Sequence, residues 1–141
     1  MSFKCVDGDS KAYPFPCASS SGINAGEVCV WDVTNNVIKV ATASLLAEDL
    51  ACVPIADAPT AGGLVQAIPI KLMGNLWEWD CTNNTNADQL CQRSLLTDAA
   101  TVANTTTEQA VDEVTVIPIQ NVGAAANKKQ RGFFAYQPAV S

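Results

Sequence analysis

The 141-residue sequence contains no histidine. Histidine is the commonest general acid–base group, and both the Ser-His-Asp and the Cys-His arrangements of nucleophilic enzymes require it. Its absence argues against hydrolysis by an activated nucleophile. The glycines also lack a phosphate-binding context, since neither Gly62-Gly63 nor Gly123 stands in a G-x-G-x-x-G or Gly-Lys-Ser/Thr pattern. We therefore expect no cofactor and no enzymatic activity.

Basic residues are scarce as well. Eight Lys and Arg stand against fourteen Asp and Glu, which gives a formal net charge of −6. Binding to a phosphate backbone needs a cationic surface that releases counterions, so we expect no nucleic-acid partner. The one basic cluster, Lys128, Lys129 and Arg131, is too short to reverse this balance. Such a cluster is typical of a solvated turn, or of a contact with an acidic neighbouring subunit.

Long apolar runs are missing too. No run reaches the roughly 18–20 residues that span a bilayer, which predicts no membrane partner. The first ten residues, MSFKCVDGDS, lack the apolar core of a signal peptide, so we expect synthesis in the cytoplasm without export by that route. The length suits one domain with a single core.

Cysteine, in contrast, is plentiful. No two cysteines have the two-to-four-residue spacing of a zinc site, and without histidine a metal would need four separated thiolates. We therefore expect no structural metal. Free, mostly buried thiols are the default in a reducing cytosol, whereas one or two disulfides can form after release into oxidising surroundings, and both states stay open. The six residues are Cys5, Cys17, Cys29, Cys52, Cys81 and Cys91.

The longest stretch with one consistent pattern is LVQAIPIKLMGNLWEWDC, residues 64–81. Apolar residues recur at every second position on both sides of Gly74, which is the period of a β-strand. Because Pro69 cannot donate to a central ladder, we expect one edge-accessible strand that bends or bulges at Gly74. Trp77 and Trp79 would share a face that either the core or a partner covers.

The rest of the chain predicts short strands between turn clusters. Residues 42–52, TASLLAEDLAC, have leucines at helical spacing and predict a short helix. Residues 1–25, rich in Gly, Pro and Ser, predict an N-terminal arm or loop that leads into a β domain over residues 26–141. The expected fold is all-β, a small barrel or sandwich of about five to eight strands with at most one or two short helices. Further strands are expected at 26–33, 37–41, 53–55, 111–120 (apolar on both sides near its end) and 132–136.

Eight aromatic residues are candidate interface anchors, because aromatic side chains are enriched at protein contacts. Phe133 and Phe134 are adjacent, so on a strand they point to opposite faces and cannot both enter one core. A second sheet that covers both faces is the alternative. The candidates are Tyr13, Phe15, Trp31, Trp77, Trp79, Phe133, Phe134 and Tyr136.

Glu78 and Asp80 lie two apart on one face of the expected strand, a spacing compatible with paired-carboxylate chemistry on a glycoside. Trp77 and Trp79 beside them resemble the stacking aromatics of a sugar site. The simpler interpretation is that the carboxylates are the solvent side of a strand whose other side buries the tryptophans. A carbohydrate-binding or host-attachment module, and a glycosidase that depends on Glu78, are therefore alternative functions.

Several features, taken in order along residues 10–137, resemble the small β-domain head decoration (cement) proteins of tailed bacteriophages. They are YPFP at 13–16, GEVCVWDV, LLAEDL, a loop ending in Gly-Gly, IPIKLMGNLWEWD, an Asn/Thr-rich turn, and VTVIPIQ followed by KKQRGFFAY. The resemblance implies a structural virion protein, made in the host cytoplasm, that binds the capsid exterior as a homo-trimer and bridges subunits of the major capsid protein. It carries over no individual functional residue.

Overall fold

The computed structural model describes residues 3–41, 50–104 and 113–137. These residues contain eleven β-strands and two short 3-10 helices, which confirms the predicted all-β class, with more strands than expected. No helix among them is long and apolar enough to cross a membrane. The elements are β1 (Lys4–Asp7), β2 (Tyr13–Cys17), β3 (Cys29–Asp32), β4 (Val37–Val40), β5 (Leu50–Pro54), β6 (Gly63–Pro69), β7 (Leu76–Cys81), η2 (Ala87–Gln89), β8 (Leu95–Asp98), β9 (Thr101–Ala103), β10 (Glu113–Val122), η3 (Ala125–Asn127) and β11 (Lys129–Gln137).

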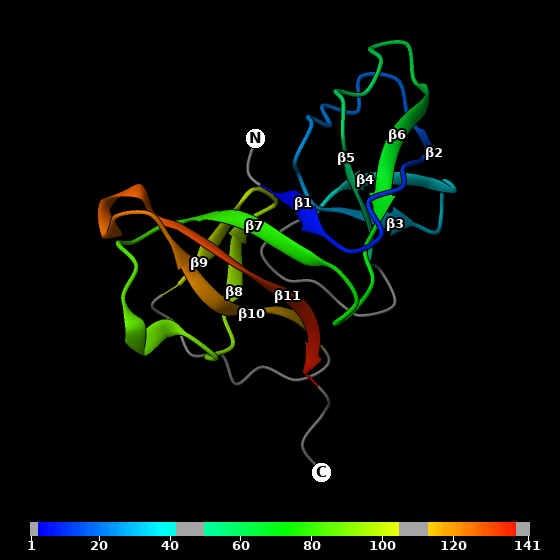
Figure 1. Cartoon of the computed structure of the whole chain (residues 1–141). Helices are drawn as coiled ribbons and strands as arrows, with labels where there is room; N and C mark the ends of the chain where they lie inside the picture. The colour runs from blue at the N-terminus through cyan, green and yellow to red at the C-terminus, as the bar shows by residue number, and fades with distance from the viewer. Residues whose placement is uncertain (1–2, 42–49, 105–112, 138–141) are drawn as a thin grey trace.

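Five strands close into a small barrel in the order β2-β4-β3-β5-β6 (Figure 1). Every pair in it is antiparallel except β2 with β4, which run parallel. Barrel diameter grows with the number of strands, so a barrel of five strands leaves room inside only for small and medium-sized side chains. The residues that fill this barrel core fit that limit: Cys17, Ile23, Cys29, Ile38, Ala51, Cys52, Val65 and Ala67.

The remaining strands form a second sheet in the order β10-β11-β7-β9-β8, with β1 paired to β7 as well. Ser94, which precedes β8, exchanges two backbone hydrogen bonds of 2.9 Å with Val116 of β10. This bridge returns the path to its first strand, so the sheet is rolled almost into a second barrel. Its interior holds large side chains, among them Trp77, Trp79 and Phe134.

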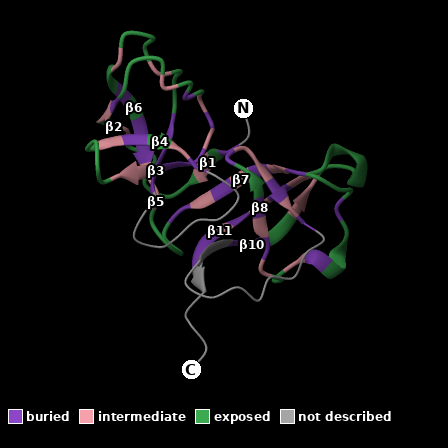
Figure 2. Ribbon diagram, turned by 180° about the vertical axis from the view of Figure 1, so that it is seen from behind, coloured by how far each residue is buried: buried purple, intermediate pink, exposed green. Residues whose placement is uncertain are grey.

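The two halves of the molecule share one apolar core. In β3, β5 and β6 the inward-facing residues of the barrel alternate with Val30, Val53 and Ile68, which point the other way and join the cluster of Trp77 and Trp79. Where two neighbouring residues are both buried, as in Cys29–Val30, Cys52–Val53 and Ala67–Ile68, the strand is covered on both faces. Figure 2 colours these buried residues purple. Buried on both sides, the junction fixes the barrel against the rolled sheet.

The prediction of one strand over residues 64–81 is wrong. The stretch forms β6 and β7, which belong to different sheets and are joined by a turn rather than a bulge. In that turn Met73 adopts a left-handed φ of 58°, and the Gly74 N–H donates to the Lys71 carbonyl at 3.2 Å. Of the helix predicted over 42–52, residues 42–49 lie outside the described residues, and Leu50–Cys52 belong to strand β5.

The N-terminal segment, predicted as an arm or loop, contributes a strand to each sheet. β1 pairs with β7, and β2 pairs with β6 along its whole length. The backbone N–H groups of successive strand residues point to alternate sides of the strand. The prolines at positions 14 and 16 therefore remove donors from one side of β2 only, and the N–H groups on its other side can still pair with a neighbouring strand. Phe3, only 1% exposed, then packs in the shared core, where its ring centroid lies 5.3 Å from that of Phe134.

Asp9 ties the segment between β1 and β2 to the turn between β6 and β7. Its carboxylate accepts a hydrogen bond from Lys71 Nζ at 2.9 Å, and its backbone carbonyl accepts one from Asn75 Nδ2 at 2.8 Å. The hydrogen bond from Lys71, with a backbone one from Lys11, holds the pKa of Asp9 below its usual range. Any stability that this pair contributes is present at neutral pH and is lost as the pH falls through the lowered pKa.

Replacing Lys71 with alanine is expected to raise the pKa of Asp9 toward its ordinary value of about 3.9, because the side-chain hydrogen bond that most stabilises the ionised carboxylate is removed. Carboxyl carbon shifts followed by NMR titration measure this directly. Lys39→Ala, which removes an exposed cation of β4, is the matched control and should leave Asp9 unchanged. An identical Asp9 pKa in all three proteins would contradict the contact.

Candidate functional site

Three of the predicted interface anchors are core residues. Trp77, Trp79 and Phe134 are each 0% exposed, because alternation in β7 and β11 turns them toward the inside of the rolled sheet. The rings of Trp77 and Phe134 meet edge to face, with centroids 5.8 Å apart. Of the two alternatives left open by the sequence, the structure has the core rather than a partner cover these three side chains, and neither tryptophan can stack on a sugar in this structure.

The two carboxylates of β7 lie on the opposite, outer face of the strand and are paired with cations of β11. Glu78 accepts a hydrogen bond from Arg131 Nε at 3.0 Å, and Asp80 forms an ion pair with Lys129. The hydrogen bond to Asp80 raises the pKa of Lys129. The structure therefore does not bring these carboxylates to the tryptophans, and it places two members of the predicted basic cluster in a strand rather than in a turn.

The other candidate anchors have different degrees of exposure. Tyr13 is 44% exposed, and Lys11 Nζ lies 5.1 Å from its ring centroid. Phe15 and Trp31 are half-buried against the barrel core, with ring centroids 6.1 Å apart. Phe133 is half-buried on the outer face of β11, and the side chain of Tyr136 lies outside the described part of the chain.

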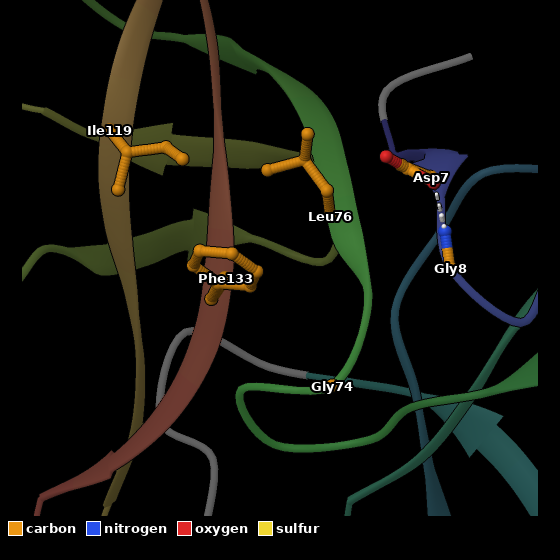
Figure 3. A pocket seen from close by; sticks show the side chains of 6 residues that line it. All are labelled: Asp7, Gly8, Gly74, Leu76, Ile119 and Phe133. Atoms are coloured by element: carbon orange, nitrogen blue, oxygen red, sulfur yellow. Dashed lines mark hydrogen bonds between the residues drawn. The ribbon is translucent and has the colours of Figure 1, made fainter.

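Phe133 contributes to an apolar groove on the outer face of the rolled sheet, which we call the outer groove. Leu76, Phe133 and Ile119 lie side by side on the neighbouring strands β7, β11 and β10 (Figure 3). The hollow has a volume of about 310 Å³ and is completed by Asp7, Gly8 and Gly74. Three different strands thus each supply one apolar side chain to the same hollow.

The outer groove is open to solvent. Ile119 is 44% exposed, and the adjoining turn before β7 exposes Leu72 at 42% and Met73 at 58%. The Met73 N–H donates to the Phe134 carbonyl at 2.8 Å, which holds this turn beside β11. Apart from Phe133, sequence reasoning missed these residues. The signal that could have found Ile119 is that residues 111–120 are apolar on both sides near their end.

The described lining of the outer groove combines three apolar side chains with one carboxylate. Among the described residues that line it, Asp7 is the one with an ionisable side chain, and its carboxylate accepts a hydrogen bond from the Gly8 N–H at 2.7 Å. Within residues 3–41, 50–104 and 113–137 no three His, Cys, Asp or Glu side chains are grouped to hold a metal ion. A shallow apolar hollow of this kind accepts a hydrophobic side chain from another protein.

Comparisons with models of protein families, with curated proteins and with solved structures each gave no significant match. The function must therefore be inferred from the chemistry of this chain and from the resemblance of its sequence features to phage decoration proteins.

Proposed function

We propose that the chain is a structural virion protein that decorates the outside of a tailed-phage capsid and bridges subunits of the major capsid protein. The observation that carries the proposal is the outer groove, a solvent-exposed hollow into which Leu76, Ile119 and Phe133 place apolar side chains. Its occupant would be an apolar side chain on the outer surface of the shell. We propose a structural protein rather than a glycosidase, because the carboxylates of Glu78 and Asp80 are paired with cations of β11.

The architecture suits a rigid module that binds through side chains. A closed barrel has no edge strand, so addition of a strand from a partner is disfavoured there, and in the rolled sheet the Ser94–Val116 bridge pairs part of the free edge of β10. A net charge of −6 repels DNA and favours a position outside the shell. In a trimer, three copies of one modest contact would act together, and avidity would exceed the affinity of one copy by orders of magnitude.

Co-sedimentation with capsid shells of the cognate phage, emptied of DNA and stripped of decoration protein, tests this function. The chain should pellet with assembled shells and should not bind unassembled capsid subunits, because bridging requires neighbouring subunits held in fixed positions. Equal binding to both forms, or binding to neither, would contradict the proposal. Analytical ultracentrifugation of the free chain tests the trimer separately.

Ile119→Asp is expected to weaken shell binding at least about tenfold, since an anchored aliphatic side chain contributes about 1.5–3 kcal/mol and 1.4 kcal/mol corresponds to a factor of ten. Ile119 is 44% exposed, so the variant should fold normally, which a thermal melt verifies. Leu64→Asp is the matched control, because Leu64 is 60% exposed on the barrel strand β6. Equal losses for the two variants would place the contact elsewhere.

A further inference from the structure

Two of the six thiols face each other inside the barrel. Cys29 of β3 and Cys52 of β5 are register partners in an antiparallel pair, and each is 0% exposed. Directly opposed residues of such a pair have Cα atoms about 4.5 or 5.5 Å apart. Both separations fall within the range of about 4.4–6.8 Å that a disulfide bridges. The backbone therefore already has the spacing that an S–S bond needs.

The side chains are aimed at each other as well. After the Cys29–Cys52 pair the register steps to Val30 and Leu50, so Ala51 is the extra residue of a β-bulge. A bulge re-aims the side chains next to it, and here both Ala51 and Cys52 enter the barrel core. A hydrogen bond between the two thiols, together with burial, raises the pKa of Cys52.

The other four cysteines lack this arrangement. Cys17 lies in the same barrel core, but its strand β2 is paired with β4 and β6 rather than with β3 or β5. Cys81 is buried in the rolled sheet, where its thiol donates to Gln130 Oε1 at 3.4 Å. Cys5 is half-buried and Cys91 is exposed. Of the six residues, only Cys29 and Cys52 are opposed on neighbouring strands.

We propose that Cys29 and Cys52 form an intramolecular disulfide when the chain folds in the presence of a small-molecule disulfide such as oxidised glutathione. One cysteine thiolate attacks a sulfur of glutathione disulfide, which gives a mixed disulfide and releases one glutathione thiolate. The second cysteine thiolate then displaces the other glutathione. In total two S–H bonds are lost and one S–S bond forms, while glutathione disulfide is reduced to two thiols that take up the two protons.

Burial decides when this exchange can occur. Both sulfurs are enclosed in the barrel core, so glutathione cannot reach them in the folded protein. We expect the bond to form while β3 and β5 are still coming together, and to resist reductants once the barrel has closed. It would join strands on either side of a loop of about 24 residues, and a cross-link of that length should raise the melting temperature by about 10 °C.

Peptide mapping of the full-length chain, refolded from the reduced state in a glutathione redox buffer, tests the proposal. Free thiols are blocked before digestion with trypsin, which cleaves after Lys11, Lys39 and Lys71. Cys52 then lies in peptide 40–71, whereas Cys29 lies in peptide 12–39 together with Cys17. We expect these two peptides to be linked in the wild type, with fragment ions that place the bond at Cys29.

Two variants separate the possible partners of Cys52. Cys17→Ala should retain the linked peptides, and Cys29→Ala should lose them. The reduced and oxidised preparations of Cys29→Ala should have the same melting temperature. The wild-type fragment ions give the same answer if an alanine variant fails to fold. Unlinked peptides in the refolded wild type, or a bond that the fragments assign to Cys17, would overturn the proposal. The outcome is independent of shell binding, which the outer groove governs.

Discussion

Trp79→Ala is expected to lower the free energy of unfolding by about 3–5 kcal/mol, the range for truncation of a buried aromatic side chain. Trp79 is 0% exposed, and its ring centroid lies 6.1 Å from that of Phe3. Because this cluster also contains Val30 and Val53 of the barrel, the cavity would weaken the junction between barrel and rolled sheet along with the sheet itself. Equilibrium unfolding in urea measures the loss.

Val33→Ala is the matched control for that experiment. Val33 follows β3 and is 77% exposed, so its truncation should change the free energy of unfolding by less than about 0.5 kcal/mol. The same pair of variants also tests whether Trp79 is free to bind a ligand. If Trp79→Ala unfolded at the wild-type urea concentration and instead abolished binding to an oligosaccharide, Trp79 would be a surface residue and the packing described for β7 would be wrong.

Local periodicity predicted the orientation of β7 but not what covers it. Alternation placed Trp77 and Trp79 on one face and Glu78 and Asp80 on the other, and the structure confirms that parity. Whether the tryptophan face meets a partner or the core depends on how the sheet rolls. The roll of the sheet involves the pairing of Ser94 with Val116, two residues that lie far apart in the sequence, and neither segment has a pattern that indicates this pairing.

The missed boundaries have local causes. The turn between β6 and β7 places Met73, rather than Gly74, in the left-handed conformation that Gly or Asn usually fills, so the position of Gly74 indicates a bend within one strand rather than a turn between two. The sequence predicts that the last strand begins at residue 132, because the basic residues before it are typical of a solvated turn. In the structure β11 begins at Lys129. Gln130 lies between the half-buried, ion-paired Lys129 and Arg131 and is 0% exposed, as strand alternation requires.

The outer groove and the thiol pair were hidden for a different reason. Both are formed by residues that come together only through strand pairing: Leu76, Ile119 and Phe133 across β7, β10 and β11, and Cys29 with Cys52 across β3 and β5. A single sequence shows which residues are apolar or contain a thiol. It does not show which strands become neighbours, because the register depends on long-range packing. Both candidate sites could therefore be identified only once the pairing of the strands was known.

The approach of β10 to β11 gives the second large effect, which Gly132→Ala should reveal. A Cβ atom added to Gly132 would collide with the carbonyl oxygen of Ile117 and would lie 2.8 Å from its carbonyl carbon. It would also lie 2.7 Å from Cη2 of Trp79. Relief of these clashes would require movement of the β10 backbone and of a buried ring, and both movements are costly in free energy. We expect a loss of at least about 3 kcal/mol in the free energy of unfolding, the upper end for an overpacked site.

Gly22→Ala distinguishes this collision from the general cost of replacing a glycine. Gly22 has a left-handed φ of 72° but open space around its Cβ position, so alanine there should cost only about 1 kcal/mol of backbone strain. Urea unfolding compares the two variants, and amide hydrogen exchange should show faster opening along β10 and β11 for Gly132→Ala alone. Equal losses for the two glycines would mean that β10 and β11 do not pair in the register that brings Gly132 against Ile117. The neighbouring positions of Ile119 and Phe133, on which the outer groove depends, would then be incorrect as well.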